Sequence, residues 1–217
     1  MYTANSPGDL TTTDSTLTAV EATPDSIFDH AYGFYDVNGS GTVNISDSAI
    51  NASITGDNTT VYGMYLGGVN GDVTVSNSTI TATAEVTEDQ DGDAAYEADA
   101  TGIYAYNSNG NLTISNNTIN VTAEKNESLA DSVNDSMNAT GVRILGGNND
   151  VTIDSNTFNV TGEQSSTAVR GNSNGGGGTP RLTVTDNLFN LSGETQTGID
   201  ADAAVTSSLI DTGNVYI

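Results

Sequence analysis

The sequence contains no cysteine and no tryptophan, and only one lysine and three arginines. The lack of cysteine excludes disulfides, thiolate metal sites and a thiol nucleophile. Aromatic residues make up 6% of the 217 residues, so a core must be built mainly from small aliphatic and β-branched side chains. No run is apolar enough to span a membrane, and residues 1–20 lack the basic start and apolar run of a signal peptide.

Positive charge is scarce. The 28 acidic residues outnumber the four basic ones, and the formal net charge is -24. A chain of this charge is repelled by phosphate backbones, so we expect no nucleic-acid partner. The acidity fits a protein in concentrated salt, a protein that holds divalent cations, or simply a soluble acidic surface.

The chain is built from a repeat. The segments "TVNISDSAINA", "DVTVSNSTITA" and "NLTISNNTINV" align without a gap, and similar copies precede and follow them. The copies start near residues 10, 43, 73, 112, 151, 182 and 209. Because the steps between copies are unequal, we expect fixed strands separated by loops of variable length.

Alternating apolar and polar residues within each copy predict short strands with one buried face. One inward column is predicted from Thr12, Ile45, Val75, Ile114, Ile153 and Val184. A second inward column is predicted from Leu17, Ile50, Ile80, Ile119, Phe158, Phe189 and Tyr216. Short polar residues mark a corner between the two strands, at Ser48, Ser78, Asn117, Asn156, Asn187 and Asn214. A third column follows the glycine in "YGFY" and its equivalents, with Phe34, Met64, Ile103, Val142, Val169 and Ile199.

Three short strands per turn, one polar corner and unequal loops resemble the right-handed parallel β-helix of pectate-lyase-like proteins. The resemblance implies an all-β solenoid, here of about six coils. The sequence itself contains no segment suited to cap either end, so we expect uncapped ends. It divides the chain into an N-terminal tail, residues 1–7, and a single β-helix domain, residues 8–217. The composition is most similar to archaeal, methanogen-type adhesin-like and envelope or sheath surface proteins. This fold hosts lyases, hydrolases, tailspikes and non-enzymatic surface proteins, so it does not by itself define a function.

Two segments are candidates for a cation site. "DVNGSGTVNISD", residues 36–47, is similar to a dockerin-type calcium loop, but it aligns with the turns that enter the other coils, and we favour a solenoid turn. The loop of residues 85–99 holds seven carboxylates. Asp89, Asp91 and Asp93 within it are our candidate metal ligands, with a solvated acidic loop as the alternative. No cofactor is required by the sequence, and calcium is the one candidate.

One outward column combines aromatic and cationic residues: Tyr35, Tyr65, Tyr104, Arg143 and Arg170. Neighbours in this interaction ribbon should lie about 4.8 Å apart if the coils stack as strands do. Such a ribbon is suited to sugar stacking or protein docking, and it is equally consistent with an ordinary outward ladder. Loop sequons suitable for glycosylation occur at Asn58, Asn126, Asn134 and Asn138. We assign no role to His30.

These observations predict an extracellular, non-enzymatic structural protein of a cell envelope, sheath or surface filament. Neither terminal coil has a recognisable cap, so we expect the chain to assemble head to tail with itself. The alternative is a carbohydrate-binding or carbohydrate-cleaving β-helix, such as a tail fibre, an adhesin or a polysaccharide lyase. The expected partners are copies of the chain and glycans, without nucleic acid and without a membrane-spanning segment.

Overall fold

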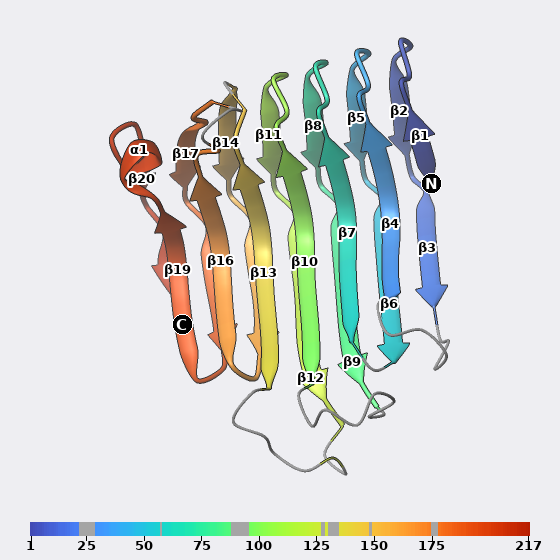
Figure 1. The fold of residues 1–217 in the computed structure, drawn as a ribbon. Coiled ribbons are helices and arrows are strands. Elements are labelled where there is room, and N and C mark those ends of the chain that lie inside the picture. The colour runs from blue at the N-terminus through green and yellow to red at the C-terminus, as the bar shows by residue number, and fades with distance from the viewer. Residues whose placement is uncertain are drawn as a thin grey trace.

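The fold is a parallel β-helix. It is seen in a computed structural model that describes residues 1–21, 29–56, 58–87, 96–126, 129, 135–147, 149–174 and 178–217. Three sheets of seven parallel strands each lie along the solenoid, and the chain visits them in turn (Figure 1). The predicted all-β class is therefore confirmed.

We name the sheets A, B and C. Sheet A contains β1 (Tyr2–Ala4), β4 (Asp29–Val37), β7 (Thr59–Gly67), β10 (Glu97–Tyr106), β13 (Ser136–Leu145), β16 (Ser165–Asn172) and β19 (Thr195–Ala201). Sheet B contains β2 (Leu10–Thr13), β5 (Val43–Ser46), β8 (Val73–Ser76), β11 (Leu112–Ser115), β14 (Asp150–Asp154), β17 (Arg181–Thr185) and β20 (Ile210–Thr212). Sheet C contains β3 (Thr16–Glu21), β6 (Ala49–Gly56), β9 (Thr79–Val86), β12 (Thr118–Lys125), β15 (Thr157–Gly162), β18 (Leu188–Ser192) and β21 (Val215–Tyr216). The helix α1 (Ala203–Thr206) packs beside β16 and β19.

The solenoid has about seven coils, where the sequence predicted about six. Part of the difference lies in residues 1–7, which we expected to form a tail. Tyr2 pairs with Tyr35, and Ala4 pairs with Val37, so that this segment supplies the first strand of sheet A. Tyr2 thereby extends the outward column of Tyr35 into one more coil.

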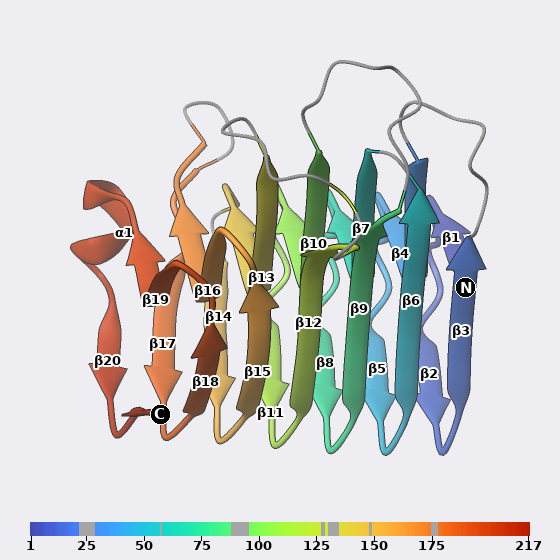
Figure 2. The same cartoon turned by 90° about the horizontal axis from the view of Figure 1, so that it is seen from below.

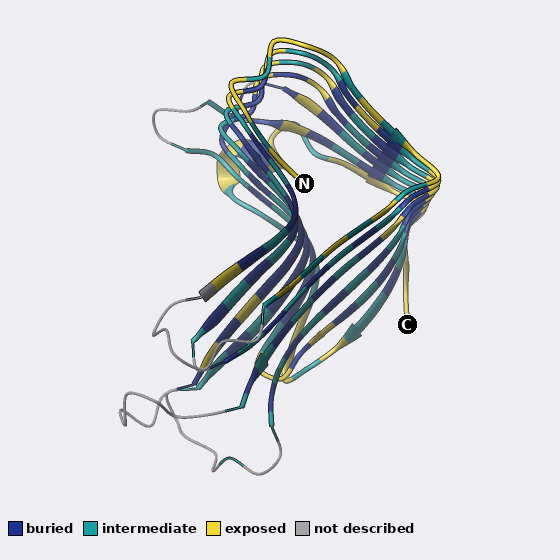
Figure 3. Cartoon of the chain, turned by 90° about the vertical axis from the view of Figure 1, so that its right-hand side faces the viewer, coloured by how far each residue is buried: buried dark blue, intermediate teal, exposed yellow. Residues whose placement is uncertain are grey.

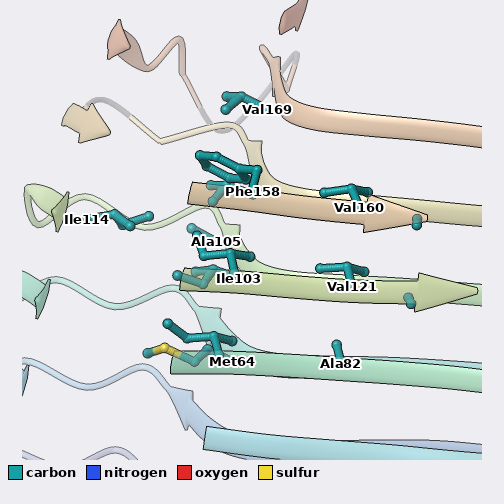
Figure 4. Close-up of a cluster of buried hydrophobic side chains, with 14 of the residues drawn as sticks. Met64, Ala82, Ile103, Ala105, Ile114, Val121, Phe158, Val160 and Val169 are labelled. Atoms are coloured by element: carbon teal, nitrogen blue, oxygen red, sulfur yellow. The ribbon is translucent and has the colours of Figure 1, made fainter. Parts of the chain in front are cut away.

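The core consists of the predicted inward columns. Ile114 pairs with Val75 on one side and with Ile153 on the other, and all three side chains are 0% exposed. The columns of sheets A and C face this one across the interior, with Met64, Ile103 and Phe158 among them (Figure 4). Alternation along each strand is therefore enough to locate most of the buried side chains.

Sheet A is bent inward in the middle of its strands (Figure 3). Alternation breaks there because four consecutive residues of β10, Ala100–Ile103, are all buried. A Cβ atom on Gly102 would lie 2.5 Å from the carbonyl oxygen of Gly141 and 2.7 Å from Cγ2 of Ile119. Glycine permits this close approach of sheet A to sheet C in β10, whereas the equivalent position of β16 is occupied by the buried Ala168. The bend makes the outer side of sheet A concave, with Thr101 and Tyr104 on either side of it.

Buried polar side chains form a ladder at the corner between sheets B and C. The turns of this corner are aligned along one edge of the solenoid (Figure 2). The N–H of Asn117 donates to Oδ1 of Asn156 (2.9 Å), and the N–H of Asn156 donates to Oδ1 of Asn187 (2.8 Å). The residue before each corner adopts a positive φ, as at Asp14, Asp47, Asn77, Asn116, Ser155, Asp186 and Gly213. Asn and Asp tolerate this conformation better than other non-glycine residues, which explains their frequency there.

Ile114→Asp tests the column assignment. The substitution places a carboxylate between Val75 and Ile153, and we expect a loss of several kcal/mol or failure to fold. Thr113→Asp, on the outward face of the same strand, is the matched control and should melt close to the wild type. Thermal unfolding followed by circular dichroism measures both, and equal melting temperatures would contradict the assignment.

Asn156→Ala tests the corner ladder. The variant removes the acceptor of the Asn117 N–H and the donor to the Ile114 carbonyl (3.0 Å), and it leaves both backbone groups buried. We expect a loss of about 2–4 kcal/mol in the free energy of unfolding in urea. Asn159→Ala removes the same side chain from an outward position of the same coil, where it is hydrogen-bonded to the side chains of Asn120 and Asn190 and to no backbone group among the described residues, and it should cost less than about 1 kcal/mol. Similar losses for both variants would show that the corner has no special role.

Candidate functional site

The structure brings the five predicted ribbon residues together on the outer face of sheet A. Tyr35 pairs with Tyr65, Tyr65 with Tyr104, Tyr104 with Arg143, and Arg143 with Arg170. Two further residues extend this column at its ends. They are Tyr2, which pairs with Tyr35, and Asp200, which pairs with Arg170.

A second tyrosine row, which the sequence analysis missed, lies across the bend from the first. Tyr32 and Tyr62 are paired on β4 and β7, and each meets the ribbon tyrosine three residues further on. The ring centroids of Tyr32 and Tyr35 are 5.0 Å apart, and those of Tyr62 and Tyr65 are 5.4 Å apart, both in edge-to-face contact. The signal was present in "YGFY" and "YGMY", where two inward residues separate two tyrosines.

Stacking within the rows engages the ring faces. Tyr35 and Tyr65 stack with centroids 5.1 Å apart and an interplanar angle of 10°. Tyr2 stacks on Tyr35 at 4.6 Å, and Tyr32 stacks on Tyr62 at 5.4 Å. A sugar that stacks on an aromatic residue needs a free ring face. In the middle of the rows the ring faces cover one another, so the rings offer mainly edges and hydroxyl groups.

The ribbon changes from aromatic to ionic character at Arg143. The guanidinium carbon of Arg143 lies 5.3 Å from the ring centroid of Tyr104, in cation–π contact. Nε of Arg170 forms an ion pair with Oδ2 of Asp200 at 2.9 Å. Nε of Arg143 is buried and has no hydrogen-bond partner among the described residues.

Crowding on the concave face shifts several pKa values. Burial, helped by the neighbouring phenols of Tyr32 and Tyr104, raises the pKa of Tyr62 to about 12. Burial also raises the pKa of Tyr32, Tyr65 and Tyr104 above the ordinary value. The Asp99 side chain remains exposed to solvent, yet the atoms packed around its carboxyl raise its pKa. The hydrogen bond from Asn138 and the charges of the two ribbon arginines act in the opposite direction.

The two candidate cation segments have different outcomes. In residues 36–47, Asp36 ends up in β4 and Asp47 at the corner after β5, and the strand β6 follows where a calcium loop would have a helix. The solenoid-turn interpretation is therefore confirmed. Asp89, Asp91 and Asp93 lie outside the described residues. Within the part of the chain that is described, no three acidic or histidine side chains are grouped so that they could hold a metal ion.

The four glycosylation candidates lie in different environments. Nδ2 of Asn138 donates to Oδ1 of Asp99 (3.2 Å) and to Oγ of Ser136 (2.7 Å), so this nitrogen is already engaged within sheet A. Asn58 is half-buried, Asn126 follows β12, and Asn134 lies outside the described residues.

Comparisons with known proteins identify no relative. No family model matches the chain, and no curated protein or solved structure is significantly similar to it. Among the described residues, no helix is long and apolar enough to cross a membrane.

Alkaline titration tests the packing of the tyrosine rows. The pKa of Tyr62 is about 12 in the folded chain against an ordinary 10.0, so the neutral phenol is favoured by folding. The corresponding stability is complete below pH 10 and is lost as the pH rises towards 12. Tyr62→Phe should therefore show a smaller fall in the free energy of unfolding across this interval. Tyr2→Phe, at a position that is 71% exposed, is the control. An unchanged pH profile for Tyr62→Phe would contradict the packing.

Proposed function

We propose that this chain is a non-enzymatic structural protein of a cell envelope, sheath or surface filament, and that it assembles head to tail through its terminal coils. The observation that carries the proposal is the pair of open sheet edges. The strands β1, β2 and β3 at one end, and β19, β20 and β21 at the other, have no outer partner among the described strands. Open parallel edges of this kind pair readily with strands of another chain.

The exposed apolar side chains support the same contact. All the large apolar side chains that are exposed in the described structure belong to the first or the last coil. They are Met1, Tyr2, Val20, Ile210, Val215, Tyr216 and Ile217. Apolar groups concentrated at two opposite ends favour a heterologous contact, in which one end of a copy binds the other end of the next.

The corner ladder is also complementary between the two ends. Every corner N–H from Ser15 to Asn187 donates to the corner side chain of the following coil. At the last coil, the backbone N–H of Asn214 has no acceptor among the described residues. At the first coil, Oγ of Ser15 donates to the carbonyl of Thr13 and keeps its capacity to accept. A second copy with Ser15 against Asn214 would continue the ladder.

Polar and charged residues in the terminal coils oppose the end-to-end contact unless their charge is screened. Thr12, paired with Ile45, occupies an inward column at one end. Asp211, paired with Val184, occupies an inward column at the other. Inward charges protect an open edge, because burying them without compensation is costly. Association should therefore be promoted by salt or divalent cations, which also screen the net charge of -24.

The extracellular location is part of the proposal. It is supported by sequons at outward positions, such as Asn44 and Asn111, which are exposed. Sugar binding by aromatic stacking, the alternative function, is disfavoured at the centre of the ribbon. The tyrosine rings stack on one another there and leave few ring faces for a sugar.

Thr11→Pro tests the end-to-end contact. The N–H of Leu10 already donates to the carbonyl of Thr42, so the N–H of Thr11 faces the open edge, and proline should remove it without disturbing the coil. Wild-type protein should show concentration-dependent association in sedimentation velocity runs with salt and calcium. Thr11→Pro should remain folded and monomeric, whereas Thr11→Val, which keeps the N–H, should associate.

Asp211→Asn supplies the opposite change. Removing the inward charge should strengthen association and reduce its dependence on salt. If wild type, Thr11→Val and Asp211→Asn all sediment as monomers at high concentration, the terminal coils do not bind each other. In that case the edges would be left for a different occupant, such as a segment of the same polypeptide outside residues 1–217.

A further inference from the structure

Two arginines lie directly opposite each other on the outer face of sheet A. Arg143 on β13 pairs in register with Arg170 on β16, in a chain that has four basic residues in all. Like charges that are opposed on neighbouring strands destabilise a sheet. Arg143 lies on the side of the solenoid, two strands in from the terminal strand β19, whereas Arg170 contacts that strand through Asp200.

The two guanidinium groups differ in how they are compensated. Nε of Arg170 forms an ion pair with Oδ2 of Asp200 (2.9 Å), and its Nη2 lies 3.4 Å from Oγ1 of Thr167. Arg143 has no ion pair with any described residue, and its buried Nε has no acceptor there. Nε itself is shielded from solvent, whereas Nη1 and Nη2 are not buried and have no hydrogen bond to a described residue, so these are the donors to which a ligand can supply acceptors.

The nearby acidic residue does not supply that acceptor. Asp99 lies within electrostatic range of both arginines, because their charges affect its titration. Its Oδ1, however, accepts a hydrogen bond from Nδ2 of Asn138 (3.2 Å), and no ion pair joins Asp99 to either guanidinium. Arg143 is instead held against the ring of Tyr104, with 5.3 Å between the guanidinium carbon and the ring centroid. The aromatic contact fixes one face of the guanidinium plane and leaves its edge with N–H donors to share.

We propose that Arg143 is the centre of a binding site for a single carboxylate group, whose oxygens accept from its guanidinium N–H donors. A planar carboxylate matches the fork of donors on a guanidinium group. A polyanion fits poorly, because Asp99 and Asp200 flank the site and the net charge of the chain is -24. The ligand is therefore a molecule with one carboxylate on an otherwise uncharged body.

Arginine side-chain NMR tests the site directly. The chain has three arginines, so protein labelled with ¹⁵N-arginine gives three Nε–H signals, which single Arg→Gln variants assign. The probes are acetate, glucuronate and N-acetylaspartic acid amide. Glucose and N-acetylasparagine amide are the neutral counterparts, at constant ionic strength in chloride. The Arg143 signal should shift saturably with the carboxylates and not with the neutral compounds. Arg181, whose Nε is paired with Asp150 on sheet B, should stay unchanged.

Variants separate recognition from general charge effects. Arg143→Gln should weaken carboxylate binding about 10-fold to 100-fold, and Arg181→Gln should leave it unchanged. Asp99→Asn removes a negative charge that repels the carboxylate ligand, so it should strengthen binding several-fold. Arg143→Lys keeps the charge but loses the fork of donors, so its affinity should fall between those of wild type and Arg143→Gln.

The relative affinities of the probes identify the source of the carboxylate. Tighter binding of glucuronate would indicate an acidic sugar, and tighter binding of the aspartate derivative would indicate an acidic protein side chain. The proposal is overturned if all three arginine signals shift in parallel, if neutral compounds act like the carboxylates, or if Asp99→Asn binds more weakly than wild type.

Discussion

One buried hydrogen-bond ladder sets the register of the whole solenoid. At each corner between sheets B and C, a side-chain oxygen accepts the N–H of the corner residue in the preceding coil. Because these groups are buried, a coil that slipped by one residue would leave both partners unsatisfied. The ladder therefore aligns equivalent positions of every copy, and the apolar columns and the tyrosine rows follow from that alignment. Loops of unequal length are tolerated because they lie outside the corner.

Alternation along the strands was enough to predict the columns. Side chains on a β-strand point alternately to its two faces. This two-residue period is enough to predict that Ile114 faces the core from β11 and that Tyr104 faces outward from β10. The same rule failed at the bend, where Gly63 and Met64 both face inward and bring Tyr62 back towards Tyr65. Tyr2 was missed because a strand of three residues carries no period.

The properties of the candidate site depend on side-chain conformations and hydrogen-bond partners, which strand register does not determine. The sequence places Arg143 next to Tyr104 in the column. It does not show that Asp99 hydrogen-bonds to Asn138, or that Nε of Arg143 has no acceptor among the described residues. Likewise, register predicts neighbouring tyrosines, while packing in the concave bend decides that their faces stack on one another. The sequence thus predicted where the ribbon lies, and the structure was needed to see which of its donors and ring faces are free.

The corner ladder also has a direction. Each N–H donates towards the C-terminal neighbour, so the corner of any coil is completed only by the coil that is synthesised after it. During synthesis, the growing end of the solenoid always carries one corner with an unpaired N–H, and this vacancy moves forward by one coil as each new copy emerges. If folding starts at the N-terminus, each finished coil presents a backbone donor that the following coil satisfies when it pairs in register.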